Sequence, residues 1–125
     1  MTLAFIAAHM LPAALSLLPS EMDTSNARIL LIAIGLQESR FRNRLQIGGP
    51  ARGVFQFEKG GGVAGVLSHK ASAAHAAKVC AALNYPASVP VVYQAIADND
   101  VLACAMARLL LWTLPGPLAT TVDDG

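Results

Sequence analysis

The stretch "SNARILLIAIGLQESRF", residues 25–41, predicts the helix around which the rest of the chain is arranged. Ser25, or Thr24 just before it, has the side chain that caps a helix N-terminus. Residues 29–36 are apolar on all sides of this helix, a pattern typical of a buried helix rather than a surface one. We therefore expect a buried central helix that ends near Phe41.

The composition predicts one folded domain. The chain has 125 residues, of which 54% are hydrophobic and 14% charged, with a formal net charge of +1. We expect a single domain over residues 1–125, with 115–125 as a weakly structured tail. The near-neutral charge argues against a nucleic-acid binder, for which a strongly basic face is expected. Four arginines nevertheless lie close together in the sequence: Arg40, Arg42, Arg44 and Arg52.

The apolar N-terminal run, residues 1–19, does not have the pattern of an export signal or a membrane span. The first basic residue is Arg28, and His9, Pro12 and Ser16 interrupt a run that is short for a bilayer. We expect a buried first helix, kinked or restarted at Pro12, with no stable membrane insertion and with synthesis in the cytoplasm.

The remaining chain predicts short helices around one glycine-rich interruption. Residues 45–65 hold seven glycines and one proline, which favours turns, and "GVFQF" at 53–57 alternates like a short strand. Helical patterns follow over 63–83, 91–97 and 100–114. The predicted fold class is therefore mainly α, with a small Gly-rich strand or turn region.

Cysteine and histidine spacing gives no indication of a metal site. Cys80 and Cys104 lie in apolar helical segments, so we interpret them as reduced core residues, with one disulfide between them as the alternative. His9, His69 and His75 have no mutual spacing that indicates metal ligation. We expect neither a metal nor a cofactor.

Glu38 is the only acid in residues 25–41, and Ser39 and three arginines follow it closely. A carboxylic acid that donates a proton near neutral pH must stay protonated, and both apolar burial and the C-terminal end of a helix favour the protonated form. Nearby arginines act in the opposite direction. The position predicts a general acid, and a solvated ion-pair cluster is the alternative.

Two motifs, Glu38-Ser39 and Gly53-Val54-Phe55-Gln56, together resemble the lysozyme-like superfamily, especially lytic transglycosylases and phage-encoded lysozyme-like proteins. In those families a Glu-Ser pair ends the first long helix of the core, and a Gly-x-x-Gln segment lines the sugar cleft. The wider stretches at 49–69 and 107–113 are similar to the phage-type branch. The resemblance covers roughly residues 25–114 and implies a lysozyme-like helical domain of phage or prophage origin.

The resemblance implies that peptidoglycan glycan strands are the partner and that the protein acts at the cell wall. Glu38 would be the catalytic acid, and Ser39, Phe55, Gln56 and Glu58 would bind substrate. For Ser39 and Gln56, local backbone hydrogen bonding is the alternative role. Glu58 either activates water or is an exposed loop acid.

Two function classes follow from these residues. The first is an enzyme that cleaves the β-1,4 bond between N-acetylmuramic acid and N-acetylglucosamine. No convincing second carboxylate is evident, which favours the transglycosylase route over hydrolysis. The second class is a non-catalytic peptidoglycan-binding or virion structural protein with the same fold.

Overall fold

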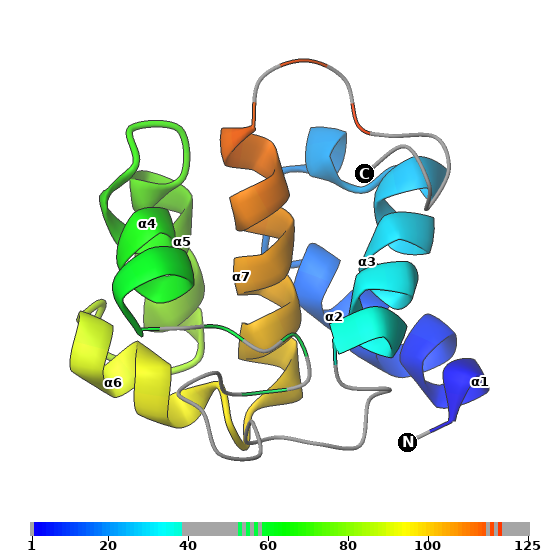
Figure 1. The fold of residues 1–125 in the computed structure, drawn as a ribbon, viewed down its shortest axis with the longest axis horizontal. Helices are drawn as coiled ribbons and strands as arrows, with labels where there is room; N and C mark the ends of the chain where they lie inside the picture. The colour runs from blue at the N-terminus through cyan, green and yellow to red at the C-terminus, as the bar shows by residue number, and fades with distance from the viewer. Residues whose placement is uncertain are drawn as a thin grey trace.

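The fold is mainly helical, with one helix in the middle and other helices on both sides of it (Figure 1). The residues that the computed structural model describes are 2–38, 53, 55, 57, 59–114, 116 and 118. Within this part of the chain no strand is formed, so the mainly α class is confirmed.

Helix α7, Asp100–Thr113, is the central element. Asn99 caps its N-terminus, because the side-chain Oδ1 accepts a hydrogen bond from the Leu102 N–H at 3.0 Å. Every residue from 102 to 109 is buried. Several of these residues are small, among them Ala103 and Ala105, so neighbouring helices can approach α7 on all of its faces.

The N-terminal segment is helical from Leu3 to Leu15. It consists of α1 (Leu3–Phe5), a wider π-helical part (Ile6–Met10) and α2 (Leu11–Leu15). Pro12 lies in the first turn of α2, where its missing N–H is tolerated because the preceding wide turn has shifted the hydrogen-bond register. The restart near Pro12 agrees with the prediction, and α2 packs on α7. The expected burial holds for one side only, because α1 has no buried residue and Leu3 and Phe5 are each 51% exposed.

Helix α3, Ser25–Glu38, begins after the 3₁₀ turn Ser20–Met22 and packs against one side of α7 (Figure 1). Thr24 Oγ1 accepts a hydrogen bond from the Ala27 N–H at 3.1 Å, as expected for a cap. Ile29 and Leu36 are 57% and 39% exposed, and the buried side of α3 is narrow. The prediction that this helix is central and buried on all sides is therefore wrong, and α7 takes that place.

The other side of α7 is covered by α4, Ala64–Ser68, and α5, Ala73–Ala82. A single helix was expected over 63–83, but the chain turns between α4 and α5. Ser72 stabilises this turn, because its buried hydroxyl donates a hydrogen bond to the Val66 carbonyl oxygen at 2.7 Å. The three glycines of residues 60–62 lie in a π-helical turn, Lys59–Val63, that leads into α4.

Helix α6, Val89–Ala95, follows a turn and lies beside the lower end of α4 and α5 in Figure 1. It begins two residues before the predicted start. Ser88 accepts a hydrogen bond from the Val91 N–H at 3.4 Å, and Pro90 occupies the first helical turn, where no N–H is needed.

The glycine-rich segment is joined to the core by its aromatic residues. Phe55 and Phe57 are both buried in the main hydrophobic cluster. Gly53 has a φ of +77°, and a Cβ at this position would lie 2.5 Å from the Ile96 carbonyl oxygen. The chain therefore turns tightly at Gly53. Within the predicted strand or turn region, the described residues form turns at Gly53 and Phe55 and a single β-bridge at Phe57.

Both cysteines are buried and free, which confirms that they are core residues. Burial raises the pKa of the Cys80 thiol. Burial also raises the pKa of Cys104 to about 12, with a smaller contribution from the negative charge of Asp100. None of the helices described here is long and apolar enough to cross a bilayer.

Candidate functional site

Glu38 is the last residue of α3, and its side chain is exposed. It forms no ion pair with any residue that the structure describes. The helical position predicted from the sequence is therefore confirmed. The apolar enclosure expected around this acid is not formed by the described residues, so the expectation of a buried carboxylic acid is wrong for this part of the chain.

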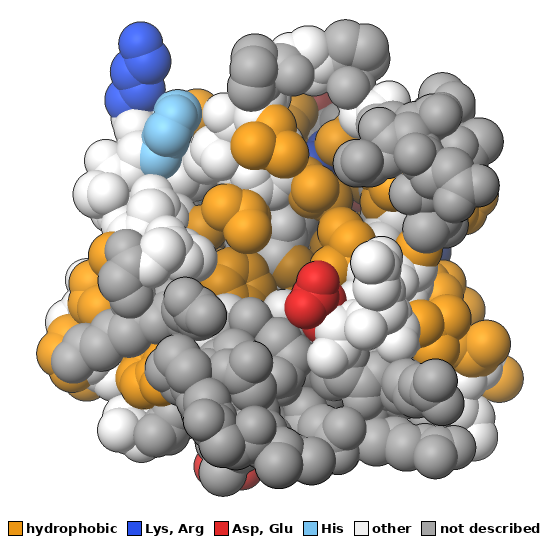
Figure 2. Space-filling model, in the orientation of Figure 1, with side chains coloured by type: hydrophobic (Ala, Val, Ile, Leu, Met, Phe, Trp, Pro, Cys, Tyr) orange, Lys and Arg blue, Asp and Glu red, His pale blue; other side chains and the backbone are white. Residues whose placement is uncertain are grey.

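The surface over α7 is hollowed between α4 and α3 (Figure 2). Figure 2 shows hydrophobic side chains gathered in this hollow and an acidic side chain at its edge, on the side where α3 ends. An exposed carboxyl group beside an apolar hollow can reach a polymer that lies across the surface.

The other predicted site residues divide into two groups. Ser39, Gln56 and Glu58 lie outside the described residues, as do the four clustered arginines Arg40, Arg42, Arg44 and Arg52. Phe55 is described, and it is 5% exposed within the hydrophobic core. Its observed contribution is to packing, and we do not assign it to a sugar-binding surface.

No three histidine, cysteine, aspartate or glutamate side chains of the described residues come close enough together to hold a metal ion. His9 instead packs its ring against that of Phe5, with the ring centroids 5.2 Å apart. The His69 Nδ1 accepts a hydrogen bond from the Ala71 N–H at 3.0 Å, which is a local turn contact.

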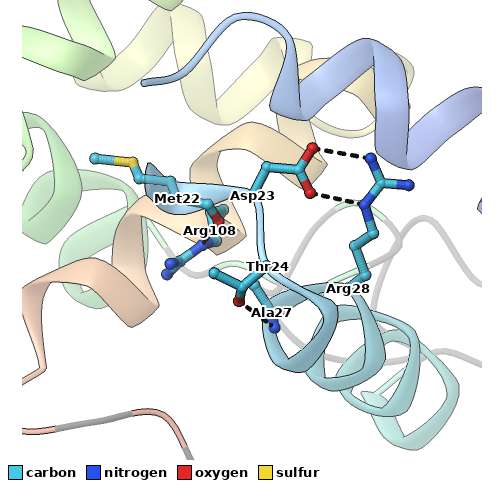
Figure 3. A network of polar contacts seen from close by, with 6 residues as sticks. All are labelled: Met22, Asp23, Thr24, Ala27, Arg28 and Arg108. Carbon is cyan, nitrogen blue, oxygen red and sulfur yellow. Dashed lines mark hydrogen bonds and ion pairs between the residues drawn. The ribbon is translucent and has the colours of Figure 1, made fainter. Parts of the chain in front are cut away.

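A second polar feature, absent from the sequence-based predictions, is the buried residue Arg108 on α7. Only 2% of this residue is exposed. Its Nε–H donates a hydrogen bond to the Met22 carbonyl oxygen at 2.6 Å, which links α7 to the segment before α3 (Figure 3). Burial lowers the pKa of the Arg108 guanidinium, and the negative charge of Asp23 partly offsets this effect.

A separate ion pair lies next to this contact. Asp23 accepts two hydrogen bonds from Arg28, from Nε at 2.7 Å and from Nη2 at 2.9 Å. Figure 3 shows that Arg28 and Arg108 lie on opposite sides of the segment from Met22 to Thr24. The Asp23 carboxylate is thus already paired with Arg28 in a bidentate arrangement, and it is not the hydrogen-bond partner of Arg108.

A cavity of about 550 Å³ lies between the N-terminal end of α3 and the C-terminal end of α7. The residues that line it are Thr24, Asn26, Arg108, Leu111, Trp112, Leu114, Gly116 and Leu118. One sequence feature could have indicated this site: the single arginine within the apolar run "LACAMARLLLW". Arginine is rarely buried in a helix unless its charged group has a partner.

Comparison with protein-family models, with curated proteins and with solved structures finds no match for this chain.

Proposed function

We propose that the protein is a peptidoglycan-cleaving muramidase that works by the lytic transglycosylase route, with Glu38 as its general acid and base. The observation that supports this proposal is the position of Glu38, whose exposed carboxyl group stands at the end of the described part of α3. The resemblance of Glu38-Ser39 and of residues 53–56 to lysozyme-like proteins supplies the substrate class.

In the proposed reaction, the Glu38 carboxyl group protonates the glycosidic oxygen while the bond to C1 of N-acetylmuramic acid breaks through an oxocarbenium-like state. The resulting Glu38 carboxylate then removes the proton from the 6-hydroxyl of the same muramyl residue. The 6-oxygen bonds to C1, and the product is a 1,6-anhydro sugar. Attack by water would instead give a reducing end.

The first test replaces Glu38 by Gln, which keeps the side-chain volume but cannot donate a carboxyl proton. Cleavage of purified sacculi should fall by at least about 10²- to 10⁴-fold, the usual contribution of general acid catalysis. Mass spectrometry of the released muropeptides distinguishes the two routes, because anhydro and hydrated products differ by one water. Anhydro products are expected.

The matched control is Glu21→Gln, since Glu21 is an exposed acid in the 3₁₀ turn before α3 and has no proposed catalytic role. It should cleave sacculi as fast as the unchanged protein. Glu58→Gln should reduce turnover much less than Glu38→Gln if an internal hydroxyl is the nucleophile. An active Glu38→Gln protein would remove Glu38 from the mechanism.

A wall-binding protein without cleavage is the second candidate, and the exposure of Glu38 favours it. Catalytic acids of glycosidases are commonly enclosed by apolar side chains, which keep them protonated. Sedimentation with sacculi without release of soluble muropeptides, unchanged in Glu38→Gln, would support binding and contradict the enzyme.

A further inference from the structure

The cavity between α3 and α7 is distinct from the surface around Glu38. Asn26 lines the cavity near the start of α3, whereas Glu38 is the last residue of the same helix. Twelve residues of α-helix separate them, which corresponds to about 18 Å. An inference about this cavity is therefore independent of the function proposed for Glu38.

Arg108 has more hydrogen-bond donors than the described residues use. A guanidinium carries five N–H donors, and the Nε–H of Arg108 bonds to the Met22 carbonyl oxygen. Its Nη1 is buried and has no acceptor among the described residues. A buried cation with unused donors is costly in free energy, and an anion that supplies acceptors would remove that cost.

The remaining walls of the cavity suit the body of an organic acid. Trp112 packs on the guanidinium of Arg108, whose Cζ lies 5.6 Å from the ring centroid, and the ring is partly exposed. Leucine side chains add apolar surface: Leu111, Leu114 and Leu118. Asn26, which is exposed at the start of α3, adds a polar group. A bare inorganic anion would leave these apolar walls unused.

We propose that this cavity binds a small organic carboxylate, whose oxygens accept hydrogen bonds from Arg108 and whose apolar body packs against Trp112. Arginine suits this role because its planar fork matches a carboxylate. The volume of about 550 Å³ is within the range of small-molecule sites.

Trp112 is the only tryptophan of the chain, so its fluorescence reports directly on this cavity. The full chain is titrated with phenylacetate and, separately, with phenylacetamide, a neutral molecule of the same shape, at constant ionic strength. Phenylacetate should change the fluorescence saturably, and phenylacetamide should bind at least about tenfold more weakly because it lacks the charge. Inorganic phosphate should give no saturable change. The absence of a saturable fluorescence change with phenylacetate would contradict the proposal. Equal affinity for phenylacetate and phenylacetamide would also contradict it.

Two variants test the role of charge. Arg108→Lys keeps the positive charge but loses the fork, so phenylacetate should bind more weakly; undiminished binding would contradict the assignment to Arg108. Because a buried substitution can also impair folding, Asn26→Asp provides the second test. It places a negative charge at the cavity in the first turn of α3, where the helix dipole tolerates it well.

Asn26→Asp should weaken phenylacetate binding by about three- to tenfold through charge repulsion. The matched control is Gln94→Glu, the same change from amide to acid at an exposed residue of α6 that does not line this cavity. It should bind phenylacetate like the unchanged chain. Equal affinity in Asn26→Asp and the unchanged chain would overturn the proposal.

Discussion

At the scale of single residues, Gly53 determines how the glycine-rich segment reaches the core. Its φ is +77°, and a Cβ on this residue would approach the Ile96 carbonyl oxygen to 2.5 Å, which leaves no room for a side chain. Gly53→Ala should therefore lower the free energy of unfolding by about 1–3 kcal/mol. Urea unfolding followed by circular dichroism measures this change.

Gly65 is the matched control for that substitution. It lies in α4, and a Cβ there would meet no atom within 4 Å. Gly65→Ala should raise the free energy of unfolding by about 0.5–1 kcal/mol, because alanine loses less conformational freedom in a helix. If both alanine variants were equally destabilised, the loss at Gly53 could not be attributed to its φ and its contact with Ile96.

At the scale of elements, the start of α3 carries a pH-dependent contact. The hydrogen bonds and charge of Arg28 lower the pKa of the Asp23 carboxyl below that of an unfolded aspartate, about 3.9. Above about pH 4 the ion pair therefore makes its full contribution to the free energy of unfolding. This contribution is lost as the pH falls through the lower pKa that Asp23 has in the folded protein.

The stability difference between the unchanged chain and Asp23→Asn should be constant near neutral pH and should shrink below about pH 4. Urea unfolding at a series of pH values measures it. Arg28→Gln removes the partner, so in that background Asp23→Asn should no longer produce an acid-dependent difference. A difference that persists without Arg28 would show that another group perturbs Asp23.

The helices could be predicted from the sequence more reliably than their packing. The helical patterns over 91–97 and 100–114 placed α6 and α7 to within two residues of their observed starts. The turn between α4 and α5 was missed because no glycine or proline marks it, and the Ser72 hydrogen bond that stabilises it is not a sequence pattern. The apolar composition of α3 and α7 is similar, so the sequence did not indicate which of them is central.

The candidate site could be predicted only in part, because it too depends on how the helices pack against one another. The position of Glu38 near the end of a helix follows from the local pattern, whereas its exposure depends on which segments pack against α3. Arg108 was not among the predicted site residues. Its hydrogen bond to the Met22 carbonyl oxygen joins residues 86 positions apart, and the local sequence pattern gives no indication of such a contact. Contacts of this range come from the packing of elements, which helical periodicity does not specify.

At the scale of the whole molecule, the two buried thiols report on the opening of the core. Cys80 on α5 and Cys104 on α7 are both fully buried, and the pKa of Cys104 is raised to about 12. Their alkylation by iodoacetamide should be slow in the folded protein throughout pH 7 to pH 9, since both thiols are buried and few thiolates form. In urea, both thiols should react rapidly and with the normal pH dependence.

Mass spectrometry of the alkylated peptides separates the two positions. Cys104 should be labelled no faster than the molecule unfolds as a whole, because α7 packs against helices from both halves of the chain. Rapid labelling of Cys104 under native conditions would indicate that α7 opens independently.

The central position of α7 has a consequence for synthesis. The helix that buries the apolar faces of α2 and α3 is made after all the other helices described here. At about 5–20 residues per second, a ribosome needs roughly 5–20 s to proceed from α2 to the end of α7. During this interval the faces of α2 and α3 that pack on α7 lack that helix, so nascent chains stalled before α7 should bind chaperones and should be released from them once α7 has left the exit tunnel.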